Sequence, residues 1–426
     1  MVKRRTNHKV AIGVVVALLT IACTSTDTSQ PPVEETVTEE SPVQEDAPLT
    51  LGYLLPETGM FSFVGPPMVS GVQLAVQAIN DAGGVLGSRI QLLSADEGDD
   101  ANLALAQANR LIASGVQAII GAATSGITES IMGDVTKAGV VQCSPSNWSV
   151  GLANVEDNGY FFRTTPGNLI QAPVLAELIA NEGFQTVSVT AQNDDYGLPM
   201  MTETVKQLEA RGVEVVISDV FDDETVDFNS LVSAILRSGA EAHVLLTFSE
   251  GAQIIQGLLD GGVSPTTLFG SDGIASPVFS DNFASPDVIE GMRVTGLAVT
   301  VPESFQAQLL AFNPNLVDFL FAPNTYDCVN LIALAASAGG STAPASIRDH
   351  MIAVTVGDNA CDTFVECLAF INRGETIAYQ SATGIPLALT QVRQGGGDPS
   401  YGIVETSTWT GSQLVQTETV VGALNR

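Results

Sequence analysis

Hydroxyl-bearing residues stand where a predicted strand gives way to a predicted helix, in Gly121-Ala122-Ala123-Thr124-Ser125-Gly126. The first turn of a helix leaves backbone N–H groups without partners inside the helix. Thr124 and Ser125 add two hydroxyls to those groups, a combination that suits a carboxylate or another polar acceptor. Either residue could instead cap the helix, so the segment predicts an acceptor-binding turn or an ordinary helix start.

Asp272 is a second candidate for ligand binding. It lies in the turn Gly270-Ser271-Asp272-Gly273, after a predicted strand at 266–269. A carboxylate at a site that excludes water binds a cation strongly. Aspartate in such a turn often bonds its own backbone instead, which is the structural alternative.

A hydrolase is the enzyme class that the chain suggests most directly, through Thr247-Phe248-Ser249-Glu250-Gly251. This run lies on a strand-to-helix turn, but Thr247 replaces the first glycine of a nucleophile elbow. His243 lies at the far end of the preceding strand, several residues from Ser249. The pattern predicts that the chain is not a serine hydrolase.

Metal and cofactor signals are also weak. The chain has three histidines, and the spacing in Asp96-Glu97-Gly98-Asp99-Asp100 fits no EF-hand loop, so we expect no metal site. It has no P-loop lysine and no Gly-x-Gly-x-x-Gly, so we expect no nucleotide cofactor.

Short apolar strands alternate with segments of helical period, first over 49–142 and again over 168–269. The expected strands of the second unit are 186–190, 213–218, 243–247 and 266–269, with helices near 168–182, 198–211, 227–238 and 250–260. This rhythm predicts the α/β class, with two Rossmann-like lobes that each contain a parallel sheet covered by helices on both faces.

The N-terminal residues predict where in the cell the protein is located. Lys3, Arg4, Arg5 and Lys9 precede an apolar run at 10–22 that is too short to cross a bilayer, which is typical of a secretory signal. The run ends in Leu19-Thr20-Ile21-Ala22-Cys23, which resembles a bacterial lipoprotein cleavage box. We expect residues 1–22 to be a signal peptide, Cys23 to be lipidated, and 23–47 to be a flexible acidic tether. The alternative is an ordinary cleaved signal with a coincidental cysteine.

Charge excludes one class of partner. The formal net charge is −31, and removal of 1–22 would take away four of 16 basic residues and none of 47 acidic ones, leaving −35. Such a chain is repelled by nucleic acid phosphates and anionic lipid headgroups, so we expect no nucleic acid partner and attachment to a membrane only through the lipid.

Four cysteines remain after Cys23 for an oxidising compartment. Cys361 and Cys367, six residues apart in a polar stretch, are expected to form a local disulfide. Cys143 and Cys328 each fall in an apolar element and are interpreted as buried thiols, with their pairing left open.

The order of several short motifs resembles the branched-chain amino acid type of periplasmic binding protein, the type I solute receptors of ABC importers. The resemblance covers about 49–340 and rests on these runs: Leu51-Gly52-Tyr53-Leu54-Leu55-Pro56-Glu57-Thr58-Gly59, Asn80-Asp81-Ala82-Gly83-Gly84-Val85-Leu86-Gly87, Ile120-Gly121, Ser144-Pro145-Ser146-Asn147, Asn193-Asp194-Asp195-Tyr196-Gly197, Gly270-Ser271-Asp272-Gly273 and Thr325-Tyr326-Asp327.

The resemblance implies roles for individual residues. Ser125 would hold the carboxylate of an amino acid, and Asp272 its ammonium group. The full set of ligand-binding residues expected on this basis is Phe63, Thr124, Ser125, Gly126, Ser146, Asn147, Trp148, Tyr196, Phe248 and Asp272, with no catalytic residue.

Trp148 departs from the family pattern, which has a threonine at this register. A tryptophan there either closes the headgroup pocket or supplies a flat wall for an aromatic, apolar or cationic ligand. Alternatively, Trp148 turns outward and Ser149 takes its place. Phe248 lacks the hydroxyl of a family tyrosine, and Phe61 and Phe63 are either part of the side-chain pocket or ordinary loop packing.

The resemblance also implies the architecture and the activity. Lobe 1 would comprise 48–167 and 296–350, and lobe 2 would comprise 168–295 and 351–426. The lobes would close on an amino acid, branched-chain or a related small polar ligand, and present it to an ABC permease at the outer face of the cytoplasmic membrane or in the periplasm. The alternatives are a sensor that signals to a membrane partner, a receptor for amides or small carboxylates, and an envelope enzyme on the same fold.

Overall fold

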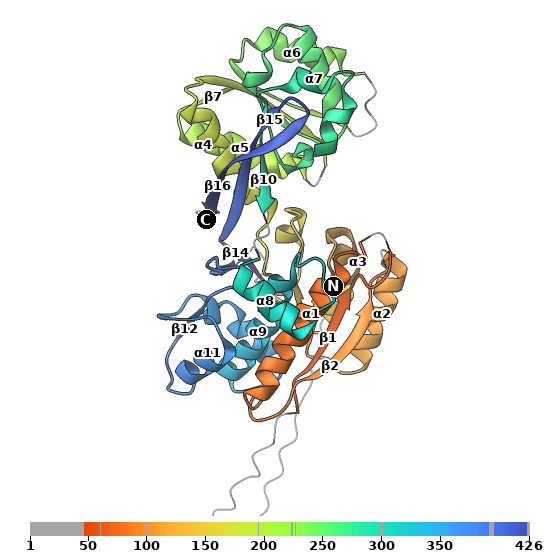
Figure 1. Cartoon of the computed structure of the whole chain (residues 1–426), viewed down its shortest axis with the longest axis vertical. Coiled ribbons are helices and arrows are strands. Elements are labelled where there is room, and N and C mark those ends of the chain that lie inside the picture. The colour runs from red at the N-terminus through yellow and green to blue at the C-terminus, as the bar shows by residue number, and fades with distance from the viewer. Residues whose placement is uncertain are drawn as a thin grey trace, which may run out of the picture. The chain divides into compact units, whose positions relative to one another are not determined.

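The computed structural model describes residues 47–59, 61–98, 100–194, 196–222, 225, 227–275, 277–298, 301–391 and 396–423. Two seven-stranded sheets, mostly parallel, organise these residues, and a two-stranded sheet is added to the first half. The colours of Figure 1 show that each half combines distant parts of the chain, red and orange with blue in one, and yellow and green with dark blue in the other.

The first sheet has the strand order β13-β14-β5-β4-β3-β1-β2. Neighbours from β5 to β2 are parallel, β14 joins β5 in parallel, and β13 is antiparallel to β14. The bounds of these strands are Thr50–Leu55 (β1), Gln91–Asp96 (β2), Ala118–Gly121 (β3), Val141–Ser144 (β4), Phe161–Arg163 (β5), Leu389–Gln391 (β13) and Gly397–Pro399 (β14).

Helices cover both faces of the first sheet. α1 and α9 pack together on one face around a large apolar core, and α2 and α3 pack together over a second core. The bounds are Gly65–Asp81 (α1), Ala101–Ala113 (α2), Ser125–Lys137 (α3), Glu303–Phe312 (α8), Ala322–Gly339 (α9), Pro344–Met351 (α10) and Phe364–Ile371 (α11).

Local signals in the sequence explain several of these boundaries. α2 begins because the Asp100 carboxylate accepts hydrogen bonds from the N–H groups of Asn102 and Leu103. α1 ends where Gly83 and Gly84 adopt φ values of 105° and 77°, a region that favours glycine.

The second sheet has the order β16-β15-β10-β9-β8-β6-β7. Its strands are Thr186–Gln192 (β6), Glu214–Phe221 (β7), Ala242–Leu246 (β8), Leu268–Gly270 (β9), Arg293–Ala298 (β10), Tyr401–Thr410 (β15) and Gln413–Ala423 (β16), of which β15 and β16 are antiparallel. α4 (Gln171–Asn181) and α5 (Gly197–Ala210) cover one core, and α6 (Asn229–Ser238) and α7 (Gly251–Asp260) the other.

The α/β class and the two sheet-containing lobes are confirmed, since both sheets are mostly parallel and flanked by helices. The expectation that all of 351–426 belongs to lobe 2 is wrong. β13 and β14 extend the first sheet, and β11 (Asn359–Cys361) and β12 (Ile377–Tyr379) pack with α11 on the core around α9. β15 and β16 join the second sheet, and so does all of β10, so the expectation that lobe 1 resumes at 296 is also wrong.

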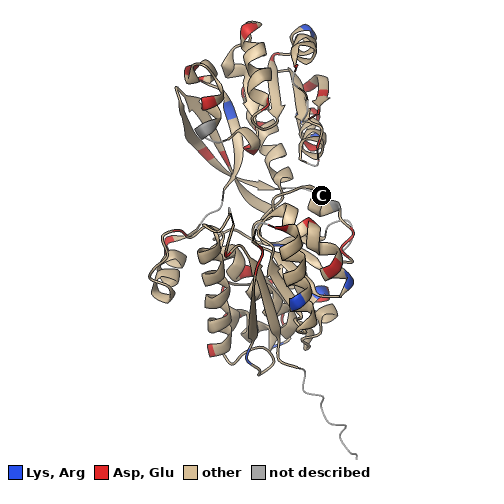
Figure 2. Cartoon of the chain, turned by 90° about the vertical axis from the view of Figure 1, so that its right-hand side faces the viewer, with Lys and Arg blue, Asp and Glu red and all other residues tan. Residues whose placement is uncertain are grey.

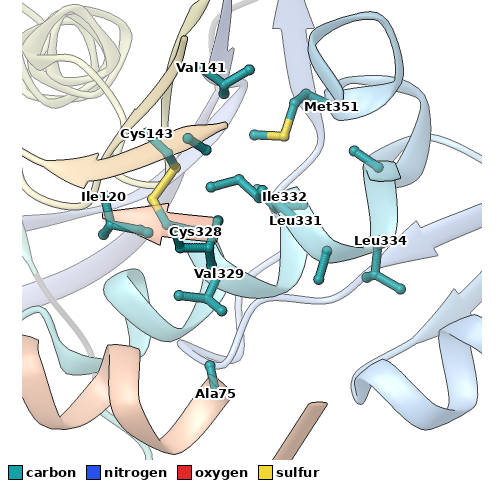
Figure 3. Close-up of a cluster of buried hydrophobic side chains, with 14 of the residues drawn as sticks. Ala75, Ile120, Val141, Cys143, Cys328, Val329, Leu331, Ile332, Leu334 and Met351 are labelled. Atoms are coloured by element: carbon teal, nitrogen blue, oxygen red, sulfur yellow. A yellow bond between two sulfur atoms is a disulfide. The ribbon is translucent and has the colours of Figure 1, made fainter. Parts of the chain in front are cut away.

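The buried core of the first half holds a disulfide that the sequence left open. Cys143 and Cys328, expected as buried thiols, are joined between β4 and α9, and Figure 3 shows the bond among apolar side chains that include Ile120 and Val329. The expected bond between Cys361 and Cys367 is also present.

Acidic residues outnumber basic ones, 47 to 16, and they are not confined to one part of the fold (Figure 2). Figure 2 shows acidic residues on elements of both halves. No helix among the described residues has the length and apolar character needed to span a membrane. The predicted signal peptide, Cys23 and all but the last residue of the tether lie outside the described residues.

Candidate functional site

The turn after β3 carries its hydroxyls at the start of α3, as the sequence predicted. Thr124 is extended, with φ −91° and ψ 144°, and its side chain makes no capping hydrogen bond to the helix. The Ser125 hydroxyl accepts a hydrogen bond from the N–H of Ser149 at 3.3 Å. A Cβ at Gly126 would meet no atom within 4 Å, so the first turn of α3 is open on this side.

The turn after β4 is bonded to the turn after β3. Ser146 donates from its hydroxyl to the carbonyl of Ala123 at 2.7 Å. Asn147 is fully buried, and its amide donates to the carbonyls of Ala122 and Ala123. The Asn147 side chain therefore holds the two turns together, behind the surface that Ser146 lines.

Trp148 faces the same space as Ser125 and Ser146. Its indole N–H donates to the Thr165 hydroxyl at 2.8 Å, and its ring meets Phe321 edge-on at 5.9 Å. The arrangement with Trp148 turned outward and Ser149 in its place is wrong. A cavity of about 320 Å³ is lined by Phe61, Phe63, Val64, Ala123, Thr124, Ser125, Ser146, Trp148, Leu320 and Phe321.

Leu320 and Phe321, just before α9, are cavity residues that the sequence did not reveal. They follow Trp148, the last of the other lining residues, by more than 170 positions, and only the packing of α9 on α1 brings them to the site. Phe321 has φ 59°, a left-handed conformation that is costly for a bulky residue and often accompanies a functional constraint.

The aromatic loop after β1 is tied down by Asp96 at the end of β2. The Asp96 carboxylate accepts from the N–H groups of Glu57, Thr58 and Gly98 and from the Thr58 hydroxyl. Burial alone would raise the pKa of Asp96, but these four hydrogen bonds outweigh it and lower the pKa. The loop that presents Phe61 and Phe63 is thus anchored to the neighbouring strand.

A buried ion pair supports the backbone around Trp148. Arg163, at the end of β5, makes a bidentate pair with Asp398 of β14, with both side chains almost fully buried. The same guanidinium donates to the carbonyls of Asn147 and Ser149 at 3.2 and 2.7 Å. The sequence gave no signal for this pair, because its members are 235 residues apart.

In the second half, Asp272 lies in a short 3-10 turn after β9 and is surrounded by donors. The Tyr196 hydroxyl donates to one carboxylate oxygen at 2.7 Å, and the Asn168 amide donates to the other at 3.1 Å. The Tyr196 hydroxyl is also 2.6 Å from the Ser271 hydroxyl, and the Phe248 ring lies 5.0 Å from the Tyr196 ring. Asn168 and Ser271 are members of this group that the sequence did not identify.

Burial dominates the electrostatics of this group. It raises the pKa of Asp272, although hydrogen bonds from Tyr196 and Gln171 oppose the rise. Burial, reinforced by the charge of Asp272, also raises the pKa of Tyr196 well above its usual value. Tyr196 therefore stays protonated and acts as a hydrogen-bond donor.

The predicted residues thus gather in two groups. Five of them, Phe63, Thr124, Ser125, Ser146 and Trp148, line the cavity of the first half. Tyr196, Phe248 and Asp272 form the group of the second half. Gly126 is exposed beside the first group, and Asn147 is buried behind it.

His243 and Ser249, the residues that suggested a hydrolase, each make a hydrogen bond to a different partner. The His243 ring bonds the Ser188 hydroxyl at 2.9 Å, and burial lowers the pKa of His243 to about 4. Ser249 donates to the adjacent Glu250 carboxylate. Across the described part of the chain, no cluster of three or more His, Cys, Asp or Glu side chains could hold a metal ion.

Known proteins resemble this chain along most of its length. The leucine-, isoleucine-, valine-, threonine- and alanine-binding protein of Pseudomonas aeruginosa is 25% identical over 337 residues, which are 75% of this chain and 85% of that protein.

Solved structures share the fold. The branched-chain amino acid binding protein LivJ of Streptococcus pneumoniae, in complex with isoleucine, has a TM-score of 0.56 at 22% identity, covering 89% of this chain and 100% of that one. A solute-binding protein of an ABC transporter from R. palustris, in complex with 4-hydroxybenzoate, has a TM-score of 0.59 at 16% identity, covering 89% and 98%.

The family model described as periplasmic binding protein matches residues 48–396, which include strands β1–β13 and both groups of candidate residues. The chain belongs to the periplasmic binding protein family, whose members are extracytoplasmic solute-binding proteins.

Proposed function

We propose that this protein captures a small solute with a carboxylate, most simply an amino acid, and delivers it to an ABC import permease. The observation that carries the proposal is the first-half cavity, in which the Thr124 and Ser125 hydroxyls and the first turn of α3 lie together. Hydroxyl and N–H donors at a helix N-terminus bind a carboxylate well.

The second half would complete the site. In the proposal, Asp272 accepts the ammonium group of the amino acid, while Tyr196 orients the carboxylate of Asp272. Closure of the two lobes would place ligand between the two groups, so that bound ligand stabilises the closed form.

A receptor for small carboxylates without an amine is the second candidate function. It is favoured by the contacts of Asp272, whose two oxygens already accept from Tyr196 and Asn168 and so do not require an ammonium partner. The ligands named for the relatives, several small amino acids and 4-hydroxybenzoate, are consistent with either candidate.

The proposal includes an anchor and excludes catalysis. Cys23 would carry a lipid that holds the chain at the outer face of the membrane, and residues 23–47 would allow it to reach the permease. We assign no catalytic residue, since His243 and Ser249 have the separate partners described above.

The test is a thermal-shift screen followed by calorimetric titration, using the chain without residues 1–22 and a panel of amino acids, amides and small carboxylates. Asp272→Asn should weaken amino acids about tenfold or more, because a hydrogen bond to a charged group is lost, and should leave amine-free carboxylates nearly unchanged. Asp260→Asn, at an exposed position at the end of α7, is the matched control.

Two outcomes count against the proposal. If affinity for every positively charged ligand is the same in Asp272→Asn and in the unaltered chain, the role of Asp272 is wrong. If the folded chain binds no member of the panel, the proposed function itself is wrong.

A further inference from the structure

The cavity beside Ser125 is walled mainly by aromatic rings. Phe61, Phe63, Trp148 and Phe321 line it, with Leu320 and Val64 between them, and none of the described side chains that line it carries a charge. Its volume of about 320 Å³ lies at the lower end of ligand pockets, which span roughly 300–1,000 Å³. An apolar group of a small ligand would fill this space.

Two of the walls are held in place before any ligand arrives. The Trp148 indole is fixed by its hydrogen bond to Thr165 and by edge contact with Phe321, whose backbone keeps a costly left-handed conformation. A rigid wall loses little conformational entropy when a ligand binds, so its contact contributes fully to affinity.

The other two walls expose apolar surface. Phe63 is 60% exposed and Phe61 is 40% exposed, and their rings lie 6.4 Å apart on the loop that Asp96 anchors. Neighbouring exposed aromatic side chains that face a cavity are typical of a binding surface. A ligand that covers them would recover the apolar area that the folded chain leaves in water.

Three kinds of ligand group can be compared for how well they suit the uncharged, aromatic walls of this cavity. A quaternary or primary cation would be attracted to the ring faces, but three of the four rings are phenylalanines, which attract cations less than tryptophan does, and no carboxylate of the described residues lines the cavity to strengthen the attraction. A branched aliphatic group would fill the space without using the flat walls. A ring gains about 0.5–1.5 kcal/mol from edge or offset contacts with other rings, beyond the area that it buries.

We infer that the ligand carries an aromatic ring joined to a carboxylate, as in an aromatic amino acid or an aryl carboxylic acid. The ring packs between Trp148, Phe63 and Phe321, and the carboxylate reaches Thr124, Ser125 and the first turn of α3. This inference rests on the proposed function and specifies its ligand class.

The experiment compares phenylalanine, tryptophan and 4-hydroxybenzoate with leucine, isoleucine and glycine betaine by calorimetric titration of the chain without residues 1–22. At least one ring-containing ligand should bind about tenfold tighter than leucine, from the ring contacts and the larger apolar area. The chain has two tryptophans, so Trp409→Phe leaves Trp148 as the only indole, and its fluorescence should change when the ring-containing ligand binds.

Phe63→Leu tests the ring itself, because it keeps an apolar side chain of similar length on an exposed loop. It should weaken the ring-containing ligand about fivefold and change leucine affinity less than about twofold. Val365→Ala, at a position of α11 that is 59% exposed, is the matched control and should change neither affinity.

Tighter binding of leucine, isoleucine or betaine than of every ring-containing ligand would overturn the inference and leave the proposed function standing. Equal loss of both ligand types in Phe63→Leu would overturn it as well. Failure of the folded chain to bind any carboxylate would overturn both.

Discussion

At the scale of single residues, Trp148 changes the character of the site. The family pattern predicts a hydroxyl at this register, whereas the indole forms an apolar wall and uses its only polar atom on Thr165. In the proposed function the carboxylate is then left to Thr124 and Ser125, so that the indole belongs to the apolar side of the cavity and these hydroxyls belong to its polar side.

Asp327 gives a prediction at the same scale. It is fully buried in α9 and accepts hydrogen bonds from Tyr379 and Ser381, at 2.7 and 2.5 Å, and from the N–H of Ala382. Burial raises the pKa of Asp327 to about 7, despite these bonds. Because the folded state holds this proton more tightly than the unfolded state, the stabilisation is complete below about pH 4 and is lost as pH rises through about 7.

The free energy of unfolding, measured by urea titration at several pH values, should therefore fall across this window relative to that of Asp327→Asn, which cannot titrate. The slope of the difference should be on the order of 1.4 kcal/mol per pH unit or less. Parallel pH curves for the two chains would show that Asp327 does not titrate in this range.

At the scale of elements, β14 explains why a segment near the C-terminus matters for a site near the N-terminus. It joins β5 in the first sheet, and Asp398 thereby meets Arg163, whose guanidinium holds the carbonyls on either side of Trp148. The pair links the edge of the sheet to the backbone of the candidate site.

Removal of either member of the Arg163–Asp398 ion pair should lower the stability of the fold strongly. Asp398→Ala would leave the buried Arg163 charge uncompensated, with an expected loss of about 3–5 kcal/mol in the free energy of unfolding. The double variant Arg163→Met with Asp398→Leu should lose much less, because apolar residues of similar volume replace a buried pair with little net cost.

Urea unfolding of the single and double variants measures the energetic coupling between Arg163 and Asp398. Ligand titration measures how their loss changes the affinity of the candidate site. Affinity should fall in the double variant even where stability is regained, because the carbonyls of Asn147 and Ser149 lose their donor. Additive losses of stability, or unchanged affinity in the double variant, would contradict these roles.

At the scale of the whole molecule, the two disulfides constrain very different lengths of chain. Cys143–Cys328 has a sequence separation of 185, and Cys361–Cys367 one of 6. In the chain-entropy description, a cross-link stabilises more when it closes a longer loop, by about 5 kcal/mol for the first bond and about 2 kcal/mol for the second.

The double variant Cys143→Ala with Cys328→Ala should therefore lose more stability in urea unfolding than Cys361→Ala with Cys367→Ala. Each should be compared with the unaltered chain under oxidising conditions. Equal losses would indicate that strain or packing, not loop length, governs the contribution of these bonds.

Parts of the fold follow from local pattern alone. Helical periodicity and apolar runs predicted α4–α7 to within a few residues, because these elements are stabilised by one buried face whose spacing is visible in the chain. β15 and β16 were not predicted. They alternate threonine, valine and glutamate with little apolar contrast, and their register depends on each other and on β10.

The sequence by itself determined the α/β class, the two sheets, the family and the polar turn at Thr124 and Ser125, since each rests on short runs of neighbouring residues or on the order of such runs along the chain. Only the tertiary structure decided the direction of Trp148, the addition of Leu320 and Phe321 to the cavity, the pairing of Cys143 with Cys328 and the support of Arg163 by Asp398. Arg163 and Asp398, for example, are 235 positions apart. The packing of α9 and the pairing of β14 with β5 bring such residues together, and no local pattern specifies either.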